Sequence, residues 1–294
     1  MNYFWSTVSA GLLSVAAINL AMDPTHRHAR RVVAPAAGWA ADESFLPPAN
    51  FEERGFRAAQ LKAAPRPGVA LLGSSRVIHV DGSVLRPGAG LLNLGMSNAS
   101  VEDYLALWQA FKDAGKVPPR LVVFADPWLF NERHDVKLWR ANLEYVETFL
   151  KASGRDRLWL LGQRVLRRLD AGTDLLSATV LKTSLRELFS RGPAPIEGVV
   201  VKAVDAPPGR TRIRPDGSWS FLVEPSSIRD VAQARRDAAL AMMWGGHSFT
   251  NAQYVRNERE LRFWDALAAD AAALGTKLLG VVPPYQHSIW ARYS

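Results

Sequence analysis

The chain has 294 residues, enough for one large or two small domains at about 150 residues each. Hydrophobic residues make up 48% and charged residues 22%, which excludes collagen-like, wholly disordered and disulfide-scaffold proteins. The formal net charge of +8 favours an anionic partner such as nucleic acid, anionic lipid or an acidic polysaccharide. The lack of cysteine excludes disulfides, thiolate metal sites and cysteine nucleophiles.

The first uncharged segment predicts a membrane anchor. Residues 3–22 carry no charge before an Asp-Pro pair interrupts them, and about twenty helical residues just cross a hydrocarbon layer of ~30 Å. We therefore expect residues 1–22 to form a transmembrane signal anchor, with the three aromatic residues at its start placed at the membrane interface. A cleaved signal peptide and a buried core helix are the alternatives, although the segment lacks a basic start and a small-residue cleavage site.

The basic cluster at residues 26–31 would place the following domain in the cytoplasm by the positive-inside rule. A long domain can cross the membrane despite such a cluster, so the residues leave the orientation open. Residues 23–67 are rich in alanine and proline and predict a juxtamembrane linker, with one amphipathic helix at about 51–63.

Beyond this linker, short apolar runs alternate with helical patterns, which predicts a parallel sheet covered on both faces. A helix is expected over residues 101–116, because Ser100 and Asp103 have the spacing of a capping box, and a long helix passes through Trp264. The four runs predicted as strands are residues 68–72, 91–95, 121–125 and 277–282. Residues 68–294 are thus predicted to form one α/β domain.

Two segments are predicted as additions to this domain. Residues 136–191 contain helical stretches rich in leucine and arginine, which favour a helical insertion. Its arginines could bind an anionic polymer or lipid, or could form a solvated helix face. Residues 199–221, with a turn at 216–218, favour an edge hairpin.

Polar side chains occupy each predicted strand end, and ligands of open parallel sheets bind at that edge. The four polar strand ends are residues 73–76, 93–98, 126–131 and 283–287. A serine in the turn after the first strand would lie near a helix N-terminus, whose free N–H groups stabilise an oxyanion. We expect no metal or nucleotide cofactor and no nucleic acid, because the ligand spacing, the phosphate-binding glycine loop and the interleaved basic and aromatic residues are missing.

These strand ends resemble the sequence blocks of the SGNH (GDSL-like) hydrolase superfamily. Gly73-Ser74-Ser75 is similar to the first block, residues 93–98 to the second, and residues 124–127 fall where the third lies. Together with residues 281–287 (VVPPYQH), they resemble the membrane-anchored SGNH-like proteins of bacterial envelope polymer modification, such as alginate acetylation and teichoic-acid D-alanylation proteins. The resemblance implies a flavodoxin-like three-layer α/β/α fold, a periplasmic domain on a single-pass anchor, and ester chemistry on acyl groups.

The resemblance also implies roles for individual residues. Ser75 would be the nucleophile, and its own N–H an oxyanion donor. Asn98 stands where the superfamily usually has glycine, and asparagine adopts the left-handed conformation more easily than most residues. Asp126 stands where an asparagine donor is usual, and Asn131 could substitute for it if the loop folds back.

The general base is the main departure from the superfamily, because its terminal Asp-x-x-His pair is missing after the last strand. His287 is then the best candidate for the base, ahead of His79 and His247. Two functions follow as expectations. One is action on acyl (acetyl) esters of an envelope polysaccharide at the lipid bilayer, with a membrane-bound acyltransferase as partner. The other is an inactive SGNH-like scaffold or binding module.

Overall fold

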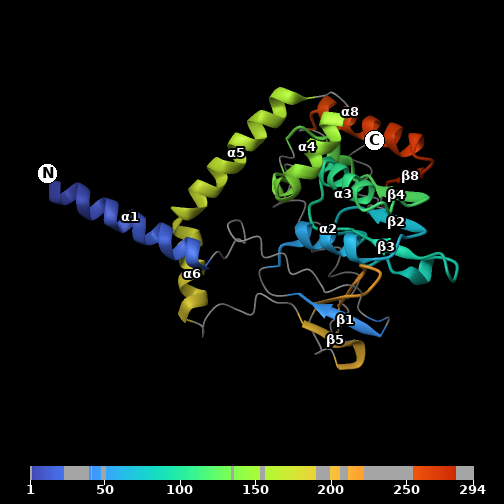
Figure 1. Ribbon diagram of the computed structural model, residues 1–294, viewed down its shortest axis with the longest axis horizontal. Coiled ribbons are helices and arrows are strands. Elements are labelled where there is room, and N and C mark those ends of the chain that lie inside the picture. Colours follow the sequence, from blue (N-terminus) through green and yellow to red (C-terminus); the bar gives the residue numbers. More distant parts are fainter. Residues whose placement is uncertain are drawn as a thin grey trace, which may run out of the picture.

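The structure is a computed structural model that describes residues 2–22, 40, 42–47, 51–133, 136–152, 156–189, 199–205, 211–221 and 254–282. Within these residues the chain forms an α/β body and a helical arm that projects from it (Figure 1). The helical arm consists of α1 (Asn2–Met22), α5 (Arg157–Leu175) and α6 (Ala178–Phe189). The body contains the two sheets, with helices α2 (Glu53–Ala63), α3 (Val101–Asp113), α4 (Leu143–Ala152) and α8 (Glu258–Ala273).

The predicted α/β class with a parallel sheet is confirmed. The sheet has the order β3-β2-β4-β8, and its three strand pairs are all parallel. Its strands are β2 (Val69–Leu72), β3 (Leu91–Asn93), β4 (Arg120–Phe124) and β8 (Lys277–Val281), which match the four predicted runs within two residues. Because parallel strands point the same way, the loops that follow them meet at one edge of the sheet.

One face of this sheet packs against α3 and α8. Ala70 and Leu72 of β2 belong to the main core together with Phe111 of α3 and Phe263 of α8, as alternate residues of a strand must share a face. α3 begins with the predicted capping box, in which Ser100 and Asp103 exchange side-chain and backbone hydrogen bonds. Every residue from Val101 to Phe111 is buried, so α3 is the central helix of the body.

The connection from β2 to β3 differs from the prediction, because a turn and a short 3-10 helix, η1 (Gly82–Val84), take the place of the expected α-helix. Val77 in this connection is fully buried and packs on two glycines. A Cβ atom at either Gly73 or Gly95 would lie 2.6 Å from a Val77 methyl carbon. A Val77 methyl group therefore occupies the space beside both glycines, and a side chain at either position would clash with it.

The second sheet is antiparallel, in the order β5-β1-β6-β7. β6 (Thr211–Ile213) and β7 (Trp219–Phe221) form the predicted hairpin, with Gly217 at φ +82° in its turn. β1 (Glu43–Leu46) lies inside this sheet and pairs antiparallel with β5 (Val199–Lys202), which forms one edge. Because β1 and α2 both pack in the body, these parts of the segment predicted as a linker belong to the fold.

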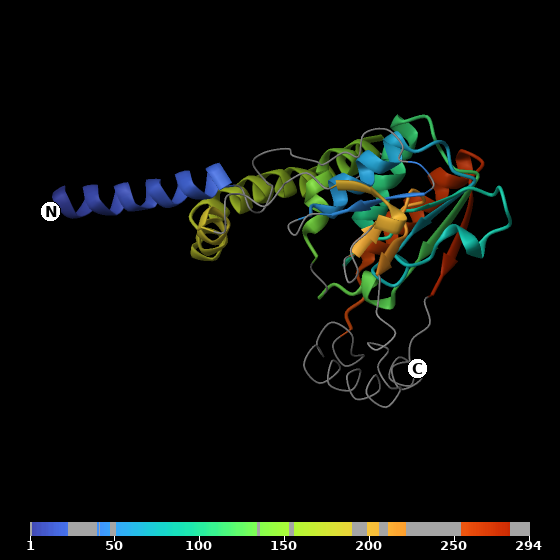
Figure 2. The ribbon, with the colours of Figure 1, turned by 90° about the horizontal axis from the view of Figure 1, so that it is seen from below.

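Most described residues of the segment predicted as a helical insertion form helices. It contains η3 (Leu138–Asn142) and α4 against the body, then α5 and α6, which lead out to α1 (Figure 2). Asn19 of α1 is buried at this junction, where its Nδ2 donates to Leu175 O at 2.9 Å and its Oδ1 accepts from Ser184 Oγ at 3.1 Å. No helix within the described part of the chain combines the length and mean hydropathy of a membrane span.

Candidate functional site

Three of the predicted site residues follow adjacent strands of the parallel sheet. Asn98, Ser75 and Asp126 lie beyond the carboxyl ends of β3, β2 and β4, so all three belong to the same edge. The side chain of Ser75 is exposed, whereas that of its neighbour Ser74 is buried. Of the two serines in this turn, Ser75 is therefore the one whose side chain reaches solvent.

Asn98 has the left-handed backbone conformation expected for it, with φ +49°. Arg54 of α2 holds this loop, because its Nη2 donates to the carbonyl oxygens of Ser97 and Asn98 at 3.0 Å each. The same guanidinium pairs with Asp103, the capping residue of α3, at 3.0 Å. A buried arginine from the segment predicted as a linker thus fixes the geometry of the second loop.

A second arginine of α2, Arg57, ties this loop to the hairpin. It is fully buried and donates to Gly95 O and Gly217 O at 2.8 Å each. Burial, offset in part by the charges of Glu53 and Asp216, lowers the pKa of this guanidinium to about 10, so it stays charged at neutral pH.

Asp126 is fully buried and forms an ion pair with Arg76, whose Nη1 lies 2.6 Å from Asp126 Oδ1. Asp126 is the acceptor in this pair, so its own side chain does not supply the oxyanion donor that the resemblance implies at this position. Arg76 follows Ser75 directly in the chain, and its side chain is 36% exposed. Arg76 brings a positive charge to this edge of the sheet, a role that the resemblance to the superfamily did not imply.

Asn131 is buried, and its side chain accepts hydrogen bonds from two backbone N–H groups. Its Oδ1 accepts from Arg133 N at 3.2 Å and from Val255 N at 3.1 Å. The bond from Val255 N and the β-bridge between Asn131 and Arg256 fasten the loop after β4, which contains η2 (Pro127–Phe130), to the segment before α8. Its carboxamide oxygen is therefore used to close the fold.

The candidate bases are only partly described. His79 is exposed, and its Nδ1 lies 3.0 Å from Trp219 O, a contact that joins the turn after β2 to the hairpin. His287 and His247 lie outside the described residues. Among the described residues, no group of three histidine or acidic side chains could hold a metal ion.

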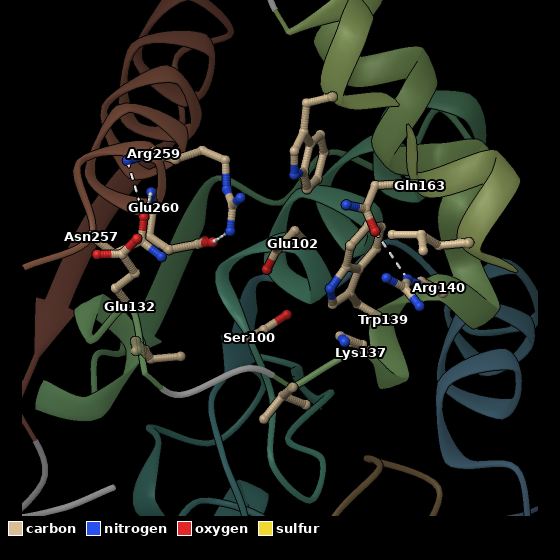
Figure 3. A pocket seen from close by; sticks show the side chains of 14 residues that line it. Ser100, Glu102, Glu132, Lys137, Trp139, Arg140, Gln163, Asn257, Arg259 and Glu260 are labelled. Carbon is tan, nitrogen blue, oxygen red and sulfur yellow. Dashed lines mark hydrogen bonds and ion pairs between the residues drawn. The ribbon is translucent and has the colours of Figure 1, made fainter. Parts of the chain in front are cut away.

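The structure also shows a cavity of about 240 Å³ that the sequence did not predict. It lies where the first turns of α3 and α8 meet the helical insertion (Figure 3). Ser100 and Glu132 in its wall come from the same loops as Asn98 and Asn131. The other polar or aromatic lining residues that Figure 3 labels are Glu102, Lys137, Trp139, Arg140, Gln163, Asn257, Arg259 and Glu260.

Two buried carboxyl groups, those of Glu102 and Glu260, face this cavity (Figure 3). Burial and then the charge of Glu260 raise the pKa of Glu102 well above its ordinary value. Burial also raises the pKa of Glu260, although Arg259 opposes this through a 2.9 Å bond to Oε1. Glu102 therefore keeps its proton to higher pH than an exposed glutamate and can donate a hydrogen bond.

The remaining walls of the cavity hold one another in place. Arg140 donates to Gln163 at 3.0 Å and pairs with Asp170 of α5. Trp139 stacks on Trp159 with ring centroids 5.4 Å apart, and the Arg259 guanidinium lies 4.9 Å from the Trp159 ring. These residues come from η3, α5 and α8, which are separate segments of the chain, and this explains why no sequence motif revealed the cavity.

Comparisons with known proteins leave this site to be interpreted from its own chemistry. The chain matches no protein-family model, no curated protein and no solved structure.

Proposed function

We propose that this chain is a membrane-anchored SGNH-like protein that acts on acyl esters, acetyl esters included, of a cell-envelope polysaccharide. One observation carries the proposal: an exposed Ser75 and a left-handed Asn98 stand on loops that follow adjacent parallel strands, at one edge of the sheet. The three-layer fold, the periplasmic location, the anchoring of α1 in the bilayer and a membrane-bound acyltransferase partner belong to the same proposal.

In this reaction the Ser75 hydroxyl oxygen attacks the ester carbonyl and forms an acyl-serine. The sugar oxygen leaves as a hydroxyl and takes up the proton that a general base, His287 in our proposal, removed from Ser75. The Ser75 N–H, the loop at Asn98 and the exposed Arg76 guanidinium are the groups that would stabilise the oxyanion. Water or a second sugar hydroxyl then attacks the acyl-serine and restores the free Ser75.

The Arg76–Asp126 ion pair supports a second candidate function, that of a non-catalytic SGNH-like scaffold or binding module. A buried carboxylate occupies the place of the superfamily's third oxyanion donor, and its partner guanidinium follows the serine directly. An edge built this way would hold an anionic segment of an envelope polymer without cleaving it.

Labelling by a fluorophosphonate probe distinguishes the two functions, because only an activated serine reacts. For an enzyme, we expect the full chain to be labelled and Ser75→Ala to lose the label. Ser97→Ala is the matched control, since Ser97 is an exposed serine on the neighbouring loop. A folded chain that takes up no label would support the scaffold instead.

A further inference from the structure

The outer face of α5 is an apolar surface. Leu158, Leu161, Val165 and Leu169 are between 51% and 86% exposed. Their spacing of three, four and four residues puts them on one side of a helix with 3.6 residues per turn. We call these four residues the α5 stripe. Soluble proteins rarely leave a contiguous surface of this kind uncovered.

The α5 stripe points away from the body. The opposite side of α5 carries Leu160, which is buried in the main core, and Gln163, which is bonded to Arg140 of η3. α1 lies on the side of α5 that faces away from the body, as both ribbon views show (Figures 1 and 2). The stripe and α1 therefore share one side of the molecule.

α1 itself adds exposed apolar residues to that side. It is uncharged throughout, and Trp5, Leu12 and Leu13 are exposed along it. Figure 1 shows α5 running crosswise to α1, close to the C-terminal end of α1. If α1 were inserted into a flat apolar layer along its own axis, α5 would therefore lie along the surface of that layer.

Basic residues border the α5 stripe. At 100° per residue, Arg157, Arg164 and Arg168 all fall along one edge of it. All three are exposed, and Arg164 also pairs with Glu147 of α4. Leucines with arginines along their border are typical of a helix that lies in a membrane interface, where the cations reach the lipid phosphates.

We propose that α5 lies flat on an anionic lipid bilayer, with the α5 stripe at the level of the acyl chains and Arg157 and Arg168 among the headgroups. This deepens the membrane anchorage in the proposed function, and it gives the arginine-rich insertion a lipid partner. α5 would fix the distance and orientation of the sheet edge relative to the membrane, because its inner side packs on the body.

The test uses the full chain, whose lack of cysteine allows single fluorophores to be attached at chosen positions. An environment-sensitive dye is placed at Leu161→Cys and Val165→Cys in the α5 stripe, at Leu13→Cys in α1, and at Ala269→Cys, an exposed residue of α8. Phosphatidylcholine vesicles with phosphatidylglycerol should shift the stripe dyes to the blue and allow nitroxide lipids to quench them severalfold. The α8 dye should not change.

Each other outcome overturns the proposal in a distinguishable way. A Leu13 dye that enters lipid while both stripe dyes stay in water would leave the anchor standing and exclude α5 from the membrane. Dyes that all stay in water would exclude the anchor as well. Stripe dyes that shift without vesicles, in proportion to protein concentration, would show that a second copy covers the stripe.

The arginine edge gives an independent measurement on the unlabelled chain. Arg157→Gln and Arg168→Gln should each weaken binding to the phosphatidylglycerol vesicles about fivefold, the equivalent of about 1 kcal/mol per basic residue near an anionic surface. Arg86→Gln is the control, because it removes the same charge from an exposed loop of the body. Equal weakening by all three variants would mean that net charge alone, and not the edge of α5, attracts the lipid.

Discussion

α3 and α5 illustrate two ways in which an amphipathic helix is covered. α3 is enclosed by α2, α4, α8 and the sheet, so its residues from Val101 to Phe111 are buried on every side. α5 is covered on one side, and its other side leaves the α5 stripe in contact with solvent. Helical periodicity thus predicts that an apolar face exists, whereas the neighbours of the helix decide whether the folded chain or a partner covers it.

Trp108 of α3 should give the largest loss of stability. It is fully buried, and its Nε1 donates to Asp270 Oδ2 at 2.6 Å. We expect Trp108→Ala to lower the free energy of unfolding by about 3–5 kcal/mol in urea denaturation. Leu161→Ala in the α5 stripe should change it by no more than about 0.5 kcal/mol. Similar losses for both variants would show that the arm folds as part of the core.

Arg76 should come next, because it neutralises a carboxylate that is buried in the body. Arg76→Ala should lower the free energy of unfolding by about 1–3 kcal/mol, since the Asp126 carboxylate loses a charged donor. Arg76→Lys keeps the positive charge and should recover part of the loss. A neutral effect of Arg76→Ala in thermal and urea denaturation would mean that other contacts of Asp126 suffice.

Replacement of Glu102 should have the opposite effect and raise the free energy of unfolding at neutral pH. Since burial raises its pKa in the folded chain, its carboxyl group favours folding below the ordinary pKa of about 4.5, and this contribution is lost as the pH rises through the folded-state pKa. Glu102→Gln should therefore raise the free energy of unfolding at neutral pH by about 1 kcal/mol. The free energy of unfolding of the variant should also fall less steeply between acid and neutral pH than that of the unchanged chain.

Glu144→Gln provides the control for that measurement, because Glu144 is an exposed glutamate in the first turn of α4. Unfolding curves of both variants should be recorded from acid to neutral pH. A loss of stability at neutral pH for Glu102→Gln, with an unchanged slope, would show that the ionised form of Glu102 stabilises the cavity.

The α5 stripe should give the smallest change in stability. Val165→Ser should alter the free energy of unfolding by less than about 0.5 kcal/mol, because the side chain is exposed. Sedimentation with phosphatidylglycerol vesicles should nevertheless show weaker binding, since the variant has less apolar surface to bury. A clear loss of stability without vesicles would place the stripe inside the fold and would break the contrast with α3.

The strands of the parallel sheet could be predicted because each is a continuous apolar run that ends in a turn. β4, for example, ends at Phe124, and one residue separates it from the pair Asp126 and Pro127. The start of α3 was predicted for a similar reason, since Ser100 and Asp103 satisfy each other over three residues. By contrast, β1 has four residues, and its partner β5 lies more than 150 residues away, so local patterns carry no sign of it.

The candidate site divides in the same way. The order of polar strand ends, the exposed turn at Ser75 and the left-handed Asn98 follow from short stretches of sequence, because backbone preferences and strand breaks are local. The Arg76–Asp126 pair, the use of Asn131 to close the fold and the burial of Glu102 beside Glu260 depend on distances between remote segments. Such distances are set by packing, and desolvation and pairing act only after the chain has folded.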